Sequence, residues 1–160
     1  MSNSRAPRSL IVFALIFVAA ARQNPHAAKL RALAADTLLV DTVRAQNAKE
    51  LPLVAVKVLD QRWFVGRESV LARQTITGAC ADRLRAFLTA NPDYSEAFLL
   101  DAQGAVVCAN ARTTNYWYGE EPRWQTSMKG AIFANDEGLI SVPVLHEAKV
   151  VGVMTAKALR

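Results

Sequence analysis

The sequence predicts an α+β domain, with helices in the first half of the chain and an antiparallel sheet in the second. Over much of residues 27–90, apolar residues recur at the three- and four-residue spacing of amphipathic helices. Beyond Pro92, they form short runs separated by turns rich in Asp, Asn and Gly, which is the pattern of strands. This order indicates a long N-terminal helix packed on a five-stranded antiparallel sheet.

The helical half contains three predicted helices. Residues 27–50 are rich in Ala and Leu, lack Gly and Pro, and are expected to form one long helix. Pro52 ends or restarts it, and a second helix through Val56, Leu59 and Trp63 stops near Gly66. Residues 67–78 are mixed and lead into a third helix over residues 79–90, which Asn91 and Pro92 close.

The second half is expected to form a meander of five strands with one helix inserted. Residues 97–100 and 105–109 read as a hairpin around a turn at 101–104. Acids before Pro122 are typical of a helix first turn, so a short helix should run to about Met128. Three further strands are expected at residues 131–133, 139–145 and 150–156, and Pro143 predicts an edge or a bulge.

The N-terminus has the features of a secretory signal. Arg5 and Arg8 precede an uninterrupted apolar run over residues 10–21 that ends in three alanines, a suitable cleavage site. The run is too short for the roughly 20 residues that span a bilayer as a helix. We therefore predict a signal peptide at residues 1–21 and a single exported, periplasmic domain at 22–160, with an uncleaved membrane anchor as the alternative.

The charge pattern argues against nucleic-acid binding. The formal net charge is +5, but Arg5 and Arg8 lie in the predicted signal, which contains no acid, so the rest of the chain carries +3. The basic residues are scattered, whereas a nucleic-acid surface requires a patch or a stripe. The two histidines, His26 and His146, have no Cys or His neighbours at ligand spacing, and we predict no metal and no cofactor.

The two cysteines leave two alternatives. Cysteines of an exported chain can pair, and Cys80 on the third helix and Cys108 on the second strand could lie close together. Both positions also look buried, and a free buried cysteine acts as a small hydrophobic residue.

The most informative segment spans residues 113–125. Four of the six Trp and Tyr residues, Tyr116, Trp117, Tyr118 and Trp124, lie within nine positions, together with Glu120, Glu121 and Arg123. Aromatic rings with a few charges are typical of a ligand site, because the rings supply buried area and the charges orient the ligand. The alternative is that the rings belong to the core and that Arg123 pairs with Glu120 on a helix surface.

The order of elements and several motifs resemble the PAS-like extracytoplasmic sensor domains called PDC or Cache domains, and especially small exported proteins with one such domain. The resemblance covers about residues 27–159 and rests on these pieces: Val43–Lys49, Leu59–Trp63, Asn91–Tyr94, Ala97–Gly104, Thr113–Gln125, Ile140–Val144 and Val151–Met154. The segment from Tyr116 to Gln125 is the most specific of them. The group usually carries Asp at the position of Asn115 and has a longer connection where this chain has the turn at 135–138.

The resemblance implies a sensor that holds a small polar metabolite against one face of the sheet. Carried onto this chain, it implicates Tyr116, Trp117, Arg123 and Trp124. Arg123 would bind a carboxylate through its planar fork, and the rings would cover an amine or apolar part of a carboxylate or amino-acid ligand. The output would pass through a partner protein such as a membrane receptor or kinase.

Two other functions compete with a ligand sensor. One is a ligand-free interaction module of the same fold, with a homodimer formed through the N-terminal helix. The other is a small hydrolytic enzyme, which the sequence disfavours. Adjacent Glu120 and Glu121 point apart on a helix, and Ser127 and His146 lack a nucleophile-elbow motif.

Overall fold

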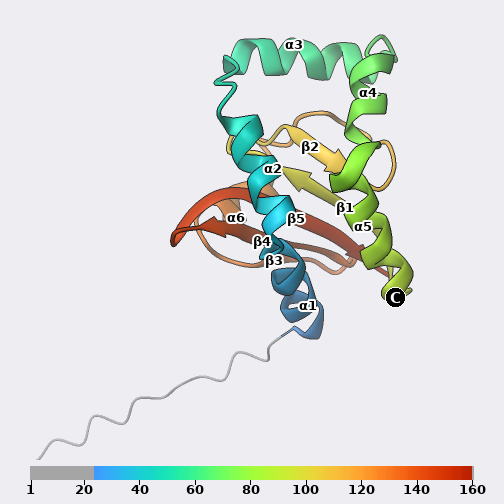
Figure 1. Ribbon diagram of the computed structural model, residues 1–160, viewed down its shortest axis with the longest axis vertical. Helices are drawn as coiled ribbons and strands as arrows, with labels where there is room; N and C mark the ends of the chain where they lie inside the picture. Colours follow the sequence, from blue (N-terminus) through green and yellow to red (C-terminus); the bar gives the residue numbers. More distant parts are fainter. Residues whose placement is uncertain (1–23, 160) are drawn as a thin grey trace, which may run out of the picture.

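The computed structural model describes residues 24–159, and the predicted signal peptide at 1–21 lies outside them. A five-stranded antiparallel sheet forms the centre (Figure 1). Helices α1, α2 and α5 cover one face of the sheet, α6 lies on the other face, and α3 lies across one end of the molecule. Among the described helices, none has the length and apolar character needed to cross a bilayer.

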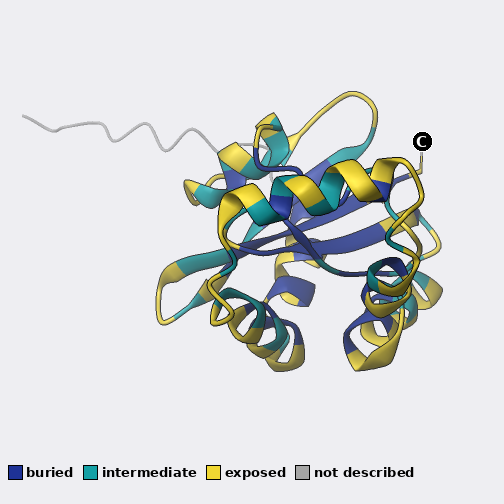
Figure 2. Ribbon diagram, turned by 90° about the horizontal axis from the view of Figure 1, so that it is seen from above, coloured by how far each residue is buried: buried dark blue, intermediate teal, exposed yellow. Residues whose placement is uncertain are grey.

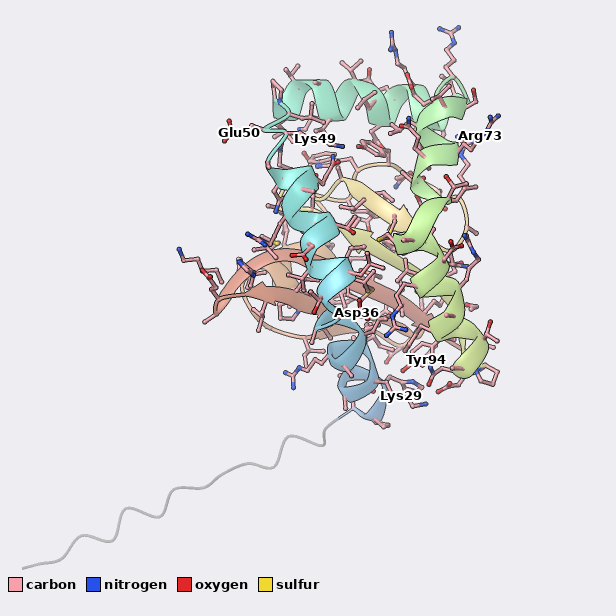
Figure 3. All side chains as sticks on the ribbon, viewed as in Figure 1. Lys29, Asp36, Lys49, Glu50, Arg73 and Tyr94 are labelled. Carbon is pink, nitrogen blue, oxygen red and sulfur yellow. A yellow bond between two sulfur atoms is a disulfide. The ribbon has the colours of Figure 1, made fainter. Side chains whose placement is uncertain are left out.

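The long first helix predicted for residues 27–50 is instead two helices, α1 (Pro25–Ala34) and α2 (Thr37–Asn47). The break falls at Asp36, which has an extended backbone and whose side chain accepts a hydrogen bond from the Leu38 amide at 3.0 Å. Asp36 is therefore an N-cap that starts a new helix. Figure 3 shows Asp36 at this junction.

Three more helices follow before the sheet: α3 (Leu53–Phe64), α4 (Ser69–Thr75) and α5 (Gly78–Ala90). The predicted second and third helices match α3 and α5, whereas α4 lies in the stretch for which no helix was predicted. Asn91 caps α5 as expected, because its side-chain amide donates to the Phe87 carbonyl oxygen at 2.9 Å.

The strands and the last helix are β1 (Tyr94–Leu100), β2 (Val106–Ala109), α6 (Pro122–Met128), β3 (Phe133–Ala134), β4 (Leu139–His146) and β5 (Lys149–Ala158). Their spatial order is β2-β1-β5-β4-β3. The five antiparallel strands were predicted correctly, but the simple meander was wrong. The last strand returns to pair with the first, so β2 and β3 form opposite edges.

Pro143 lies at an open edge, as its missing amide predicts. On that side of β4, strand β3 pairs only with Ser141 and Ile140, so Pro143 lies beyond the pairing. The ladder between β4 and β5 also shifts register between Val144 and Leu145.

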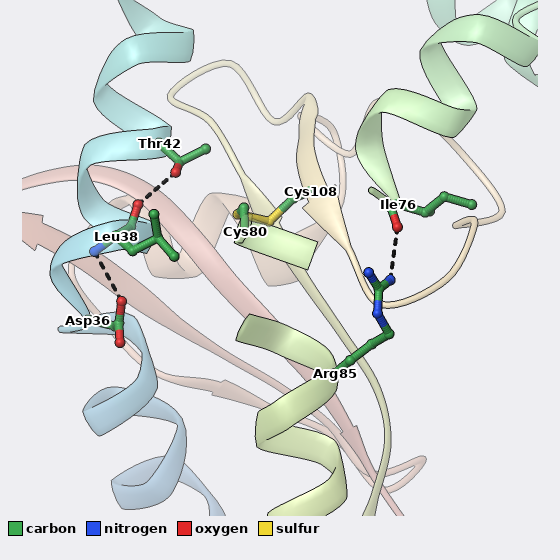
Figure 4. The surroundings of a disulfide bond; sticks show 7 residues. All are labelled: Asp36, Leu38, Thr42, Ile76, Cys80, Arg85 and Cys108. Carbon is green, nitrogen blue, oxygen red and sulfur yellow. Dashed lines mark hydrogen bonds between the residues drawn. A yellow bond between two sulfur atoms is a disulfide. The ribbon is translucent and has the colours of Figure 1, made fainter. Parts of the chain in front are cut away.

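The side chains of β1 alternate between the two faces of the sheet and so belong to two different core clusters. Ala97 and Leu99 pack toward α1, α2 and α5, while Phe98 and Leu100 pack toward the segment that precedes α6. The helix-covered face also holds a disulfide between Cys80 of α5 and Cys108 of β2, with Cα atoms 6.1 Å apart (Figure 4). This bond links a helix to the edge strand.

Candidate functional site

Residues 113–118 are anchored to α3. One carboxylate oxygen of Asp60 accepts hydrogen bonds from the backbone amides of Tyr116 and Trp117, at 2.8 and 3.0 Å. The indole N–H of Trp63 donates to the Thr113 carbonyl oxygen at 2.9 Å. The Tyr116 ring packs on Trp63 with centroids 5.6 Å apart, and both side chains are buried. Tyr116 is thus a core residue.

Two tryptophans, Trp117 before α6 and Trp124 on α6, contact the β1–β2 turn. Trp117 donates its indole N–H to the Gln103 carbonyl oxygen at 2.7 Å, and Trp124 donates to the Asp101 carbonyl oxygen at 3.1 Å. The turn and the chain before α6 lie so close that a Cβ atom added at Gly104 would be 2.6 Å from the Gly119 amide nitrogen. Both indoles therefore hold the segment against the sheet.

A cavity of about 360 Å³ opens between this segment and the α6-side face of the sheet. The sheet contributes residues of β1, β4 and β5, the connection after β2 contributes six consecutive residues, and α6 contributes one arginine. The lining residues are Glu96, Phe98, Asn110, Ala111, Arg112, Thr113, Thr114, Asn115, Tyr118, Arg123, Leu139 and Lys157.

Among the residues that line this cavity, cations outnumber acids. Arg112, Arg123 and Lys157 are present against one lining carboxylate, Glu96. Glu96 and Lys157 are register partners on β1 and β5, so a cation and an anion lie side by side on the floor. Such a lining favours a ligand with a carboxylate, with or without an adjacent ammonium group.

Arg123 is held in position before any ligand arrives. Its side chain is 17% exposed and forms an ion pair with Glu121, with Nε 2.6 Å from the carboxylate oxygen. The guanidinium carbon lies 4.9 Å from the centroid of the Tyr118 ring, a cation–π contact. Burial raises the pKa of Tyr118, so its hydroxyl stays protonated at neutral pH.

Arg112 is oriented by α3. Its Nη2 donates to the Trp63 carbonyl oxygen at 2.6 Å, and its guanidinium lies 4.9 Å from the Trp63 ring centroid. This leaves the remaining N–H groups of the fork for the cavity or for solvent. Nothing in the sequence singled out Arg112, Lys157 or Glu96, which carry no motif of their own.

Of the four residues predicted to bind the ligand, one lines this cavity and three do not. Arg123 lines the cavity, and Tyr118 lies there beside it. Trp117 and Trp124 lie outside the lining, and Tyr116 borders a different cavity of about 430 Å³ between helices α2 to α4 and strand β2. Arg123 also pairs with Glu121 rather than Glu120, which instead contacts Lys57 at 3.2 Å.

Neither histidine enters this cavity. His26 lies near the start of α1, where its ring contacts the Tyr94 hydroxyl at 2.9 Å, and His146 ends β4. Within residues 24–159, no group of three His, Cys, Asp or Glu side chains could hold a metal ion.

The fold resembles that of bacterial sensor domains. The sensor domain of the V. cholerae histidine kinase DctB matches with a TM-score of 0.50 and 16% identity, over 83% of this chain and 47% of that one. The extracellular domain of the putative histidine kinase rpHK1S-Z16 gives 0.44 and 15%, over 81% and 54%. The sensory domain of the Campylobacter jejuni chemoreceptor Tlp3, solved with isoleucine bound, gives 0.39 and 12%, over 85% and 64%.

No protein-family model and no curated protein matches the sequence. The fold is α+β and resembles that of the DctB sensor domain, as the resemblance to PDC and Cache domains predicts. It spans about half the length of the DctB sensor domain.

Proposed function

We propose that this domain is an extracytoplasmic sensor that binds a small carboxylate or amino acid in the cavity lined by Arg123. The observation that carries the proposal is the set of three cations around a cavity on the α6-side face of the sheet. Arg123 would bind the carboxylate, since it is already oriented by Glu121 and Tyr118. Glu96 would receive the ammonium group of an amino acid.

The preformed geometry favours binding over a surface role for Arg123. A side chain that is 17% exposed and held by an ion pair and a ring has lost most of its freedom before binding. A carboxylate that replaces water at this guanidinium then costs little additional side-chain entropy. The signal would pass to a partner, either a membrane receptor or kinase, or a second copy paired through α1 and α2.

The test is calorimetry on the full chain with a panel of amino acids and carboxylates. Arg123→Ala should bind the ligand so identified at least about 30-fold more weakly, because losing one partner of a desolvated charge pair costs about 2 kcal/mol or more. Arg44→Ala is the matched control, since Arg44 pairs with Asp41 on the exposed face of α2. Equal affinities for the parent and Arg123→Ala would contradict the assignment, and a panel without any binder would favour the interaction module.

We also propose that the protein is exported, on the basis of its N-terminal sequence. The charged leader, the apolar run and the three alanines predict cleavage after Ala21. Intact-mass measurement on protein from the cell envelope should give a chain that starts at Arg22. Extraction by detergent alone would indicate an anchor, and an uncleaved chain in the cytoplasm would refute export.

A further inference from the structure

Helix α3 and the start of α4 expose a cluster of apolar side chains. Of the nine large hydrophobic residues that are exposed within residues 24–159, six lie here: Leu53, Val54, Val58, Phe64, Val65 and Val70. Phe64 is 77% exposed and Val54 is 70% exposed. We call these six residues the α3–α4 apolar surface. A gathering of exposed apolar side chains on one part of the fold indicates an interaction site.

The exposed apolar side chains occupy two flanks of α3. At about 100° per residue, Val56 and Trp63 share the flank that is buried in the domain. Val54, Val58 and Val65 lie on the opposite flank, and Leu53 and Phe64 lie between the two. A partner helix packed along one stripe would leave part of this arc in water. A fluid interface can surround the whole arc.

The charges around the surface are mainly basic. Residues 53–75 contain Lys57, Arg62, Arg67 and Arg73 against the acids Asp60 and Glu68. Asp60 is turned inward to the amides of Tyr116 and Trp117. Two of the cations are paired, Arg62 with Glu68 and Lys57 with Glu120. Within residues 24–159, neither Arg67 nor Arg73 forms an ion pair, and both are exposed. The outward charge is therefore positive.

The orientation of α3 suits a flat surface. The helix lies across the end of the molecule opposite the start of α1, with Arg73 at the same end (Figures 1 and 3). Figure 2, seen from this end, shows mostly exposed and intermediate residues along it. The α3–α4 turn, formed at Gly66 with a φ of 73°, places Phe64 and Val65 beside Arg67. The full length of the helix can thus approach a plane.

We propose that the α3–α4 apolar surface binds the interface of a bilayer that contains anionic phospholipids. The apolar residues enter the boundary between headgroups and acyl chains, and the arginines contact the phosphates. Apolar side chains with a basic rim on a helix that lies in the plane are the features of interfacial binding. Arginine stems add apolar contact while their charged ends stay among the headgroups. This inference is independent of the ligand cavity.

The test is co-sedimentation of the full chain with vesicles of phosphatidylcholine alone or mixed with phosphatidylglycerol. We expect binding to the anionic vesicles that weakens at least about tenfold in the double variant Phe64→Ser with Val65→Ser. The variant Arg67→Glu with Arg73→Glu should remove the preference for anionic over neutral vesicles. All proteins carry the same N-terminus, so a difference in binding between two of them reports the changed side chains.

Leu145→Ser is the matched control, because Leu145 is also exposed but lies on the β4–β5 hairpin. It should bind vesicles like the parent. Unchanged vesicle binding by the Phe64 and Val65 variant would overturn the proposal. So would light scattering that shows a dimer which this variant dissociates, without vesicle binding by the parent, because the surface would then join two copies of the chain.

Discussion

Removing the Cys80–Cys108 disulfide is expected to lower the free energy of unfolding by about 3 kcal/mol, because the bond closes a long loop in the unfolded chain. The two cysteines are 28 residues apart and link α5 to the edge strand β2. Both are buried, so the double variant Cys80→Ala with Cys108→Ala removes the covalent link while leaving little polar disturbance. Urea denaturation measures the loss, and the melting temperature should fall by roughly 10 °C.

The parent chain provides the control for this experiment. A thiol reductant added under denaturing conditions, and kept present during refolding, should bring the parent to the stability of the double variant and leave the variant unchanged. Thiol titration of the denatured, unreduced parent should find no free thiol. Two free thiols per chain would exclude the bond, and equal stability of parent and variant would contradict its predicted stabilising effect.

The local signals in the sequence were strong enough to predict most of the fold. The hairpin turn at 101–104 was found because Asp and Gly occupy positions that a turn requires, and Asp101 indeed accepts the amides of Gln103 and Ala105. The start of α6 was found because Pro122 follows two acids. Each of these signals depends only on neighbouring residues.

The errors in the predicted fold have local and long-range causes. The break between α1 and α2 carries a local signal, Asp36 before Thr37, but the surrounding Ala and Leu pattern suits one helix equally well. Helix α4 has only seven residues, too few for a clear periodicity. The strand order depends on the pairing of β1 with β5, which are separated by about a third of the chain and have no local signal for each other.

The candidate site was located more accurately than its residues. The concentration of rings at 116–124 identified the segment that borders the cavity, and Arg123 lies in the lining. The role of each ring depends on distant partners: Asp60 and Trp63 hold the backbone and ring of Tyr116, while the indole of Trp117 reaches Gln103. Such contacts form only in the folded chain, so composition alone could not separate anchors from lining residues.

Trp63→Ala is expected to cost about 3–5 kcal/mol of stability, the largest effect of any substitution considered for this chain. The side chain is 1% exposed, packs on Tyr116, and donates its indole N–H to the carbonyl oxygen of Thr113, a residue that lines the cavity. Its loss would therefore leave a large void and release the segment that forms one wall of the proposed site.

Two variants distinguish the contributions of Trp63. Trp63→Phe keeps a ring in the core but removes the hydrogen bond, so it should cost about 1 kcal/mol. Phe64→Ala truncates the neighbouring exposed ring and should change stability by less than about 0.5 kcal/mol. Urea denaturation should find Trp63→Ala the least stable of the three variants, Trp63→Phe intermediate and Phe64→Ala the most stable. A Trp63→Ala protein as stable as Phe64→Ala would show that α3 does not anchor the segment, and the link between this helix and the cavity would be lost.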